Sequence, residues 1–237
     1  MDIYILPLAV IVIGAFLSVT TKKLTLSAAL VGAALALVIF AGTSFSGFTM
    51  MAVFFAVGTA ATAWKRELKQ NGDRNGESKE GRNVGQVLAN ATVPALCALF
   101  AILDPEHRPL FILMLAAGFS SATSDTLSSE LGMVYGRRFF NILSLRPDSK
   151  GEDGVVSLEG TAIGALGAML IAFIQFCGSG AFGDFVVVTV AGIAGNLCDS
   201  ILGASLERRR RIGNDMVNFL NTLSAAFFAF LLVAWIL

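Results

Sequence analysis

Two aspartates, Asp125 and Asp199, stand in long apolar segments that contain no lysine or arginine to pair with them. A carboxylate in the middle of a membrane costs about 2.5–3.5 kcal/mol on insertion scales and marks a functional site by default. Two such carboxylates need a cation, and a divalent metal ion is the simplest one, because hard cations prefer oxygen ligands. The residue types therefore predict a metal site at Asp125 and Asp199, with Asp215 as a third candidate ligand.

Neutral polar residues accompany these acids at spacings of three and four along four apolar segments. Residues three and four apart share one face of a helix, so each segment would present a single polar stripe. Single serines or asparagines in membrane helices usually serve packing, so the prediction of a binding site depends on the four stripes lying at one depth. The stripes are Asn83, Gln86 and Asn90; Ser121, Asp125 and Ser128 or Ser129; Asn196, Asp199 or Ser200; and Asp215, Asn218 and Asn221 or Thr222.

A glycine-rich stretch, RPDSKGEDGVVSLEGT at 146–161, precedes the sixth apolar segment. Its Gly151 and Gly154 come just before a helix that we expect to begin near Ser157. Backbone amides at such a turn, together with a helix N-terminus, can bind an anion. The stretch therefore predicts phosphate contacts, with positive charge supplied by nearby basic residues. These are Arg137, Arg138, Arg146 and Lys150.

The segments of Asp125 and Asp199 also resemble each other. AGFSSATSDTL at 117–127 aligns without gaps with AGIAGNLCDSI at 191–201, and the two aspartates align with each other. This similarity predicts a weak parallel repeat of the fifth and sixth segments in the seventh and eighth. Internal repeats often place a binding site at their interface in membrane proteins, so the two carboxylates should lie at corresponding depths.

Carboxylates for a hard cation, amide side chains and basic loops together suit a phosphorylated, water-soluble substrate that meets a lipid. Phosphoryl transfer needs little from a protein beyond positioning and charge neutralisation by Mg²⁺. A phosphomonoester has a second pKa of about 6, so an acceptor of this kind is already an anionic nucleophile at neutral pH and requires no strong general base. The chain has no Ser-His-Asp arrangement and no Walker lysine motif, so it is not a P-loop kinase.

The composition places all of these residues in a membrane protein. The 237 residues are 55% hydrophobic and 14% charged, whereas an average soluble chain is about 25% charged. The 17 basic and 17 acidic residues cancel, which gives no support for nucleic-acid binding. Three cysteines, one histidine and no Cys-x-x-Cys make a zinc site, a Cys–His nucleophile or a disulfide framework improbable. We therefore expect an all-α polytopic membrane protein.

About eight segments are long enough to form membrane helices, which need roughly 20 apolar residues. The second and third segments meet at 42–46 and should form a hairpin. The first segment is expected to be retained rather than cleaved, because its basic pair Lys22-Lys23 follows the apolar run instead of preceding it. The segments are 3–20, 24–41, 47–64, 85–103, 110–136, 158–177, 185–206 and 215–237.

The basic residues predict the orientation. If the N-terminus is outside, the inner loops hold 16 of the 17 lysines and arginines, and the outer loops hold only Arg108. Both termini are then outside, and the acids lie at the cytoplasmic level of a cell-membrane protein. We expect one helical domain over 1–237 with a flexible cytoplasmic loop at 65–84, which is rich in glycine, asparagine and charge. Arg208 to Arg211 would set the topology or contact lipid headgroups.

Five blocks of the sequence resemble one integral membrane family. They are GRNVGQVLAN at 81–90, SDTLSSELG at 124–132, GEDGVVSLEGT at 151–161, GNLCDSILGASLERR at 195–209 and NDMVNFLNT at 214–222. The family includes the phytyl-phosphate kinase of tocopherol synthesis and an animal transmembrane homologue. Through Asp125, Ser128 and Gly132 the chain is also distantly similar to the CTP-dependent dolichol and phytol kinases.

The resemblance implies a membrane kinase that uses CTP or another nucleoside triphosphate, with Mg²⁺ as cofactor, to convert an isoprenoid monophosphate to the diphosphate. It implies catalytic roles for Asp125, Asp199 and Glu130 and metal binding by Asp125, Asp199 and Asp215. The implied contacts to substrate or nucleotide are Arg82, Asn83, Gln86, Asn90, Ser128, Glu159, Asn196, Asn214 and Asn218. The polar stripe adds Ser129, and the glycine-rich stretch adds Gly154 and Ser157. The nucleotide, the chain length of the isoprenoid and the oligomeric state stay open.

Other classes of protein remain as alternatives. A cation- or proton-coupled transporter of a lipid or small metabolite would also use intramembrane acids, but its polar residues should continue to the outer face. A phosphotransferase that uses a CDP-alcohol would need clustered aspartates of the Asp-Gly-x-x-Ala-Arg type, which the chain lacks. A non-enzymatic scaffold would leave the acids within and beside the helices unexplained.

Overall fold

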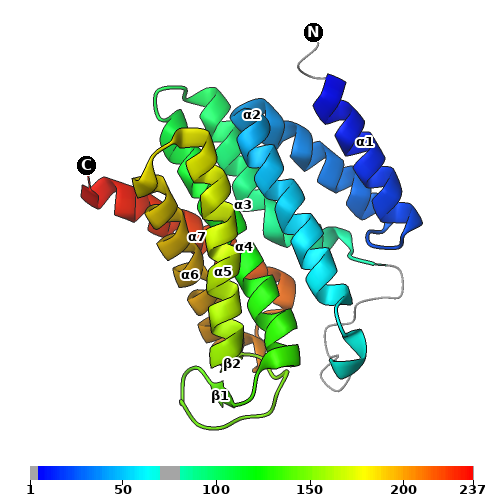
Figure 1. Cartoon of the computed structure of the whole chain (residues 1–237), viewed down its shortest axis with the longest axis vertical. Coiled ribbons are helices and arrows are strands. Elements are labelled where there is room, and N and C mark those ends of the chain that lie inside the picture. The colour runs from blue at the N-terminus through cyan, green and yellow to red at the C-terminus, as the bar shows by residue number, and fades with distance from the viewer. Residues whose placement is uncertain (1–4, 70–80, 237) are drawn as a thin grey trace.

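The computed structural model of the chain describes residues 5–69 and 81–236. Helices make up nearly all of the described chain, and a short β-hairpin closes one end (Figure 1). Of these helices, α2 to α7 are long and apolar enough to cross a membrane, so the protein is a polytopic helical membrane protein as the sequence predicts. The helices are α1 (Ile5–Thr20), α2 (Leu26–Ala63), α3 (Val84–Leu103), α4 (Arg108–Tyr135), α5 (Leu158–Ser179), α6 (Phe182–Leu202) and α7 (Asn214–Ile236).

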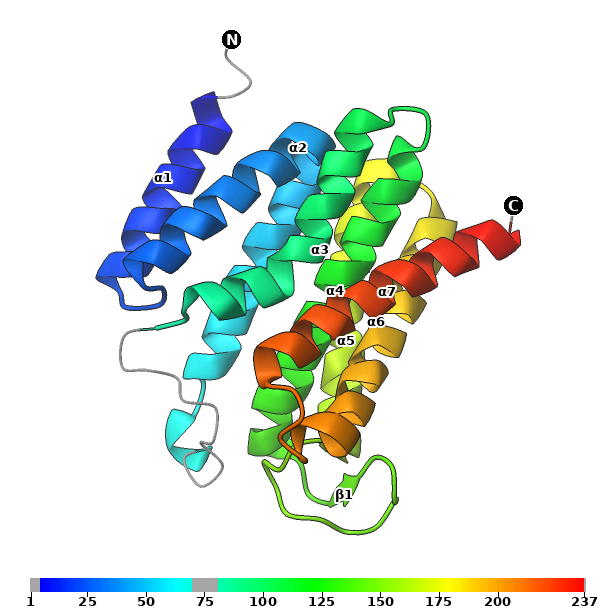
Figure 2. The same cartoon turned by 180° about the vertical axis from the view of Figure 1, so that it is seen from behind.

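Helix α2 contains both the second and the third predicted segment. The expected five-residue turn at 42–46 is wrong in detail, because only Ser44 leaves the helical conformation, with φ 57° and ψ −141°. The two arms of α2 nevertheless fold back on each other at this residue (Figures 1 and 2). Gly42 allows the bend to sit directly on α3, since a Cβ atom there would collide with the backbone carbonyl of Ala98.

Helix α4 occupies the centre of the bundle, and α2, α3, α5, α6 and α7 all pack against it. Its middle third is fully buried, with Leu115 and Phe119 in the main hydrophobic core. Helix α5 approaches it closely because glycines face it: a Cβ on Gly164 would lie 2.9 Å from the carbonyl oxygen of Ser124. Small residues at such contacts are typical of helices that pack in membranes.

Helix α6 runs beside α4 in the same direction (Figure 2). Ser120 of α4 fixes this pairing, because its hydroxyl donates to the carbonyl of Val188 on α6 at 3.1 Å. Gly192 leaves room for that hydroxyl. Helix α6 ends in one π-helical turn, η4 (Gly203–Glu207), a feature that often occurs at functional sites.

The lower end of the bundle in Figure 1 is closed by the strands β1 (Phe139–Asn141) and β2 (Val155–Ser157). They pair antiparallel with Phe139 opposite Ser157. The sequence did not predict this hairpin. The glycine-rich stretch folds against η4, where Gly154 has φ +72° and no room for a Cβ beside Ala204. The predicted phosphate loop is therefore also a packing element.

Helix α3 begins with a capping box. The side-chain oxygen of Asn83 accepts a hydrogen bond from the backbone amide of Gln86 at 3.1 Å. In return, the side-chain oxygen of Gln86 accepts one from the backbone amide of Asn83 at 3.0 Å. Just before the cap, Arg82 pairs with Leu24 in a short β-bridge. The start of α3 is thereby tied to the start of α2.

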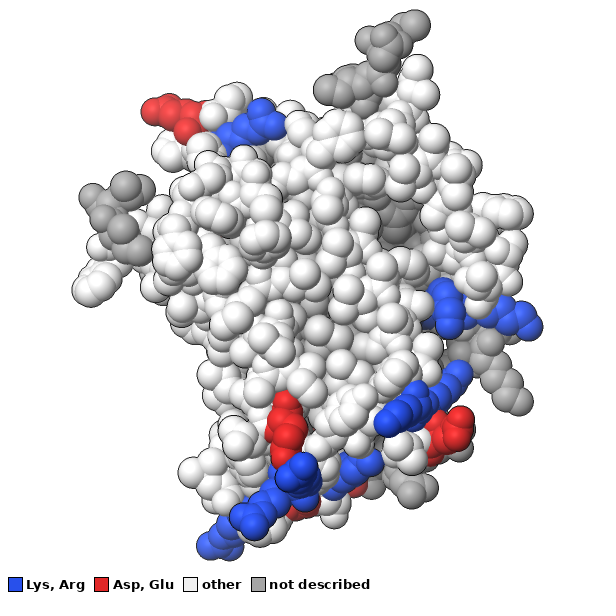
Figure 3. All heavy atoms as spheres, viewed as in Figure 1, with Lys and Arg blue, Asp and Glu red and all other residues white. Residues whose placement is uncertain are grey.

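Charged residues are concentrated at one end of the molecule. On the face drawn in Figure 3 a broad uncharged belt separates a charged lower end from a small group of charges at the opposite end. This arrangement is typical of a protein with an apolar membrane belt and one strongly charged side.

Candidate functional site

A polar cavity of about 310 Å³ lies at the charged end, between the second arm of α2, α3, α4, α6, α7 and the stretch 151–157. Residues from each of the four polar stripes line it, each stripe on a different helix. Of the predicted site residues, the cavity is lined by Arg82, Gln86, Asn90, Asp125, Ser128, Ser129, Glu130, Gly154, Ser157, Asn196, Asp199, Asn214 and Asn218.

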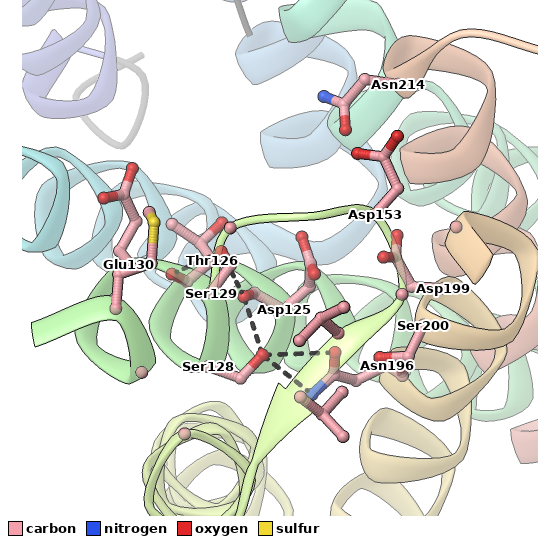
Figure 4. A pocket seen from close by; sticks show the side chains of 18 of the residues that line it. Asp125, Thr126, Ser128, Ser129, Glu130, Asp153, Asn196, Asp199, Ser200 and Asn214 are labelled. Carbon is pink, nitrogen blue, oxygen red and sulfur yellow. Dashed lines mark hydrogen bonds between the residues drawn. The ribbon is translucent and has the colours of Figure 1, made fainter. Parts of the chain in front are cut away.

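Asp125 and Asp199 face each other across this cavity from α4 and α6 (Figure 4). The two carboxyl groups interact electrostatically. The Oδ2 atom of Asp199 is buried and has no hydrogen-bond partner among the described residues. Two such carboxylates cannot both be ionised without a proton or a cation to offset their repulsion. Their oxygen atoms fit a hard divalent cation.

Asn196 and Ser128 hold the two acidic helices together beside the carboxyl pair. The Asn196 amide nitrogen donates to the Ser124 hydroxyl at 2.9 Å and to the Ser128 hydroxyl at 3.4 Å. The Ser128 hydroxyl also lies 3.0 Å from the Asp125 carbonyl (Figure 4). These contacts fix the separation of α4 and α6, so Asn196 and Ser128 position the aspartates whatever else they bind.

Glu130 has a different environment, although it lies on the same helix as Asp125. Lys69 forms an ion pair with one carboxylate oxygen at 2.7 Å, and the Thr62 hydroxyl donates to the other at 2.9 Å. The Lys69 ammonium also donates to the Ala61 carbonyl at 2.6 Å. Glu130 therefore ties α4 to the end of α2, and both its oxygens are engaged.

Lys69 lies near the start of the segment 65–84, which the sequence predicts to be a flexible loop. Its side chain is 8% exposed and fully engaged in hydrogen bonds. The 3₁₀ turn η2 (Arg66–Leu68) precedes it and places Arg66 at the cavity. The rest of that prediction concerns 70–80, which lie outside the described residues.

Three predicted site residues do not line the cavity. Asn83 caps α3. Glu159 lies at the surface end of α5 and accepts from the backbone amide of Arg137 at 3.3 Å. Asp215 lies against the start of α3, where a Cβ on Gly85 would collide with its Oδ2 atom. No three His, Cys, Asp or Glu side chains come together as a metal-binding group in the part of the chain that the structure describes. Asp215, the expected third ligand, thus lies beside the α3 N-terminus and does not line the cavity.

Ser157 likewise has a local role. Its hydroxyl accepts from the backbone amide of Gly160 at 3.1 Å and so caps α5. One of the backbone amides at the N-terminus of α5 is thus satisfied by its own chain, and the expected anion contact of this helix end stays a prediction. Positive charge reaches the cavity from Arg66 and Arg82, on the side of α2 and α3.

Two carboxylates of the cavity were not expected from the sequence. Asp153, next to Gly154, points towards Asn214 (Figure 4). Glu207 of η4 lines the same wall and interacts electrostatically with Asp153. Both residues belong to blocks that carry the family resemblance. In these blocks the sequence pattern indicated a role for the glycines and the arginines, but not for these two acids. The cavity therefore has an acidic wall on α4, α6 and 151–157, and a basic wall on α2 and α3.

Arg82 forms the centre of the basic wall. Its guanidinium lies over the Phe55 ring of α2, 6.0 Å from the ring centre. A Cβ on Gly58 would lie 3.3 Å from Nη2, so the glycine gives the guanidinium its place on α2. An arginine opposite two carboxylates is suited to an anion that also contacts a metal ion, because its planar group binds phosphate in a defined orientation.

Known proteins match most of the chain. The sequence model of the integral membrane protein family DUF92 matches residues 9–226. An uncharacterised membrane protein of Synechocystis is 31% identical over 195 residues, which are 81% of this chain and 76% of the relative. A second one from Methanocaldococcus jannaschii is 37% identical over 145 residues, 60% of this chain and 58% of the relative.

A plant relative is also similar. Protein VTE6, chloroplastic, of Arabidopsis thaliana is 30% identical over 199 residues, which cover 81% of this chain and 60% of the plant protein. No solved structure matches the chain. The family match and these relatives confirm the resemblance that the five sequence blocks indicate.

Proposed function

The chain belongs to the DUF92 family of integral membrane proteins, and we propose that it is a membrane kinase. It transfers a phosphoryl group from CTP or another nucleoside triphosphate to an isoprenoid monophosphate, such as phytyl or geranylgeranyl phosphate, and yields the diphosphate. The observation that carries the proposal is the pair Asp125 and Asp199, which face each other across the cavity. One oxygen of Asp199 is buried and has no partner in the part of the chain that the structure describes. The resemblance of the five blocks to the phytyl-phosphate kinase family supports the choice of acceptor.

Asp125 and Asp199 would hold Mg²⁺. Mg²⁺ is usually bound in proteins by one or two carboxylates together with substrate phosphates and water, so a two-carboxylate site fits it without a third acid from the chain. When bound, Mg²⁺ neutralises the charge of the transferring phosphoryl group. Asp153 and Glu207 add negative charge to the same wall and favour a cation there.

The basic wall would bind the acceptor. Arg82 lines the same cavity as the acidic wall. It would hold the monophosphate with one oxygen directed towards the triphosphate. That oxygen forms a bond to the terminal phosphorus while the bond to the leaving nucleoside diphosphate breaks. No proton has to be removed, because the acceptor oxygen is already anionic near neutral pH. The residues thus contribute position and charge, which supply most of the catalysis in phosphoryl transfer.

We propose that the cavity opens to the cytoplasm of a cell-membrane protein with eight crossings, in which α1 and both arms of α2 each span the bilayer. The 16 basic residues of the inner loops support this orientation. Both termini are then outside. An impermeant thiol reagent should reach Cys198, beside Asp199, from the cytoplasmic side only, and labelling from outside would instead indicate an alternating-access carrier.

A transfer assay tests the proposal. Purified protein in detergent is incubated with Mg²⁺, labelled CTP or ATP, and phytyl phosphate, and the lipid products are separated by thin-layer chromatography. We expect labelled phytyl diphosphate that disappears when Mg²⁺ is chelated. The matched control is the Asp184→Asn variant, which removes an acid from the other end of α6 and should keep full activity. Absence of product with every nucleotide, together with cation-driven uptake into vesicles, would establish a transporter instead.

A further inference from the structure

A second cavity, of about 210 Å³, lies between α1, both arms of α2 and α3. We call it the apolar groove. Its walls are aliphatic and aromatic side chains together with glycine and alanine, and the hydroxyl of Ser18 is engaged with the Gly14 carbonyl at 2.7 Å. Nothing in the carboxylate chemistry described above uses it.

Small residues create the apolar groove. A Cβ atom added at Gly14 of α1 would meet nothing within 4 Å, and one at Gly32 of α2 would meet only Val87 at 3.8 Å. Larger side chains would therefore fit at both positions, yet the chain leaves the space open. Gly14 is exposed, so the apolar groove is open to the surroundings of the bundle rather than enclosed within it. The space is suited to a ligand.

The apolar groove joins the polar cavity. Four residues line both of them: Phe54, Arg82, Gln86 and Asn90. At this junction the lining changes from apolar side chains to a guanidinium and two amides. A molecule that occupies both cavities must therefore have one apolar chain and one anionic end.

We propose that the apolar groove binds the hydrocarbon chain of the isoprenoid monophosphate, with its phosphate at Arg82. This inference rests on the proposed kinase function for the identity of the acceptor. A single groove accepts one chain, whereas a bilayer phospholipid would bring two. The groove is smaller than complete small-molecule sites of about 300–1,000 Å³, so it holds the isoprene units next to the phosphate and leaves the rest of the chain in the bilayer.

Photo-crosslinking tests this assignment without relying on catalysis. The probe is geranylgeranyl monophosphate with a diazirine on its first isoprene unit, and the labelled peptides are identified by mass spectrometry. We expect label on α1, α2 and α3 at the groove. Excess geranylgeranyl monophosphate should abolish it, and excess phosphatidic acid should not. Competition by phosphatidic acid, or label confined to other surfaces, would overturn the assignment.

Variants that fill the apolar groove provide the second measurement. Gly14→Leu and Gly32→Leu are made separately, on different helices, and each should reduce specific labelling by about tenfold or more. Gly183→Leu is the matched control, because a Cβ at Gly183 also meets nothing within 4 Å but lies outside the groove. Gly14→Ala and Gly32→Ala keep most of the space and should label nearly as wild type, which separates filling of the groove from loss of folding. Wild-type labelling of both leucine variants would overturn the proposal.

Kinetics separate this inference from the kinase proposal. In the leucine variants the KM for geranylgeranyl monophosphate should rise about tenfold or more, while the KM for the nucleoside triphosphate, which the polar cavity would bind, changes little. Normal kinetics with geranylgeranyl monophosphate in both variants would overturn the groove and leave the kinase intact. Specific groove labelling by a protein that transfers no phosphate would support the groove and overturn the kinase.

Discussion

Two acids on helix α4 are separated by little more than one turn and have opposite surroundings. Asp125 faces a second carboxylate, that of Asp199, whose Oδ2 atom is buried without a partner among the described residues. Glu130 faces Lys69 and Thr62, and both of its oxygens are engaged. The first arrangement requires something from outside the chain, and the second is complete in itself. An intramembrane acid therefore indicates a ligand site only once its partners are known.

Phosphoryl transfer should be more sensitive to loss of charge at the aspartate pair than to loss of charge at Glu130. Asp125→Asn or Asp199→Asn removes one oxygen ligand and half of the negative charge that would hold Mg²⁺. We expect phosphoryl transfer to fall by about a thousandfold or more, comparable with the loss of a major electrostatic contribution to catalysis. Steady-state transfer assays measure the effect.

The folded state should not suffer in these aspartate variants. Without metal the two carboxylates repel each other, so replacing one with a neutral amide should keep or raise the thermal unfolding temperature in detergent. Excess Mg²⁺ should raise the thermal unfolding temperature of the wild type but not that of the two variants. Transfer activity that survives both substitutions would eliminate the paired-aspartate site.

Substitution in the pair Lys69 and Glu130 should instead lower the stability of the folded state. Lys69→Met leaves the Glu130 carboxylate, which is 18% exposed, without its main partner. The free energy of unfolding should fall by roughly 3 kcal/mol, because a largely buried charge that loses its partner is costly. Chemical unfolding in detergent measures the change.

The matched control for this pair is the double variant Lys69→Met/Glu130→Leu. It removes both charges and should recover much of the lost stability, since an apolar pair can replace a buried ion pair. The single variant Glu130→Gln should retain measurable transfer activity. If Glu130→Gln instead abolishes transfer while the protein stays folded, Glu130 is a catalytic residue and the distinction between the two acids fails.

Arg82, on the basic wall, should affect transfer less than the two aspartates do. Replacing it with glutamine removes the guanidinium that lies between Phe55 and Gly58, and we expect transfer to fall by roughly 10–100-fold, as for loss of a hydrogen bond to a charged group. Arg82→Lys should recover only part of the activity, because an ammonium cannot make the planar contact.

The control for Arg82 is Lys23→Gln. Lys23 lies next to the Leu24–Arg82 bridge but not in the cavity, so the variant removes one positive charge without touching the proposed phosphate site. We expect its KM for the isoprenoid monophosphate to match the wild type. An equal rise of KM in both variants would mean that Arg82 acts only through general charge.

The sequence predicted those features that depend on local patterns. Hydropathy identifies the helices, and spacings of three and four place Asp125, Asp199 and Asn196 on faces that do meet. The pairing of Lys69 with Glu130 joins residues 61 positions apart, and nothing near Lys69 distinguishes it from the other basic residues of its loop. The bend of α2 depends on one residue, Ser44, and the role of Gly154 depends on contact with Ala204. These features follow from tertiary packing, which a local pattern does not contain.

The exposed pair Asp148 and Arg208 completes the comparison with the smallest expected effect. The Arg208 guanidinium donates to the Asp148 carboxylate and joins the loop between β1 and β2 to the segment after η4. The hydrogen bond from Arg208 holds the pKa of Asp148 below its ordinary value of about 3.9. The folded state lowers this pKa, so the pair stabilises the fold fully at pH values above the ordinary pKa of Asp148. This stabilisation is lost as the pH falls through the lowered pKa.

Asp148→Asn should therefore lower the thermal unfolding temperature slightly at neutral pH, and the difference from wild type should vanish in acid below the lowered pKa. High salt should also reduce the difference at neutral pH, since exposed pairs are screened. Neither acid nor high salt should reduce the stability that the pair Lys69 and Glu130 contributes, because its groups are mostly removed from solvent. If the Asp148 effect instead persisted in acid and high salt, the loop would be held by its backbone hydrogen bonds, and only the buried pair would stabilise the fold through charge.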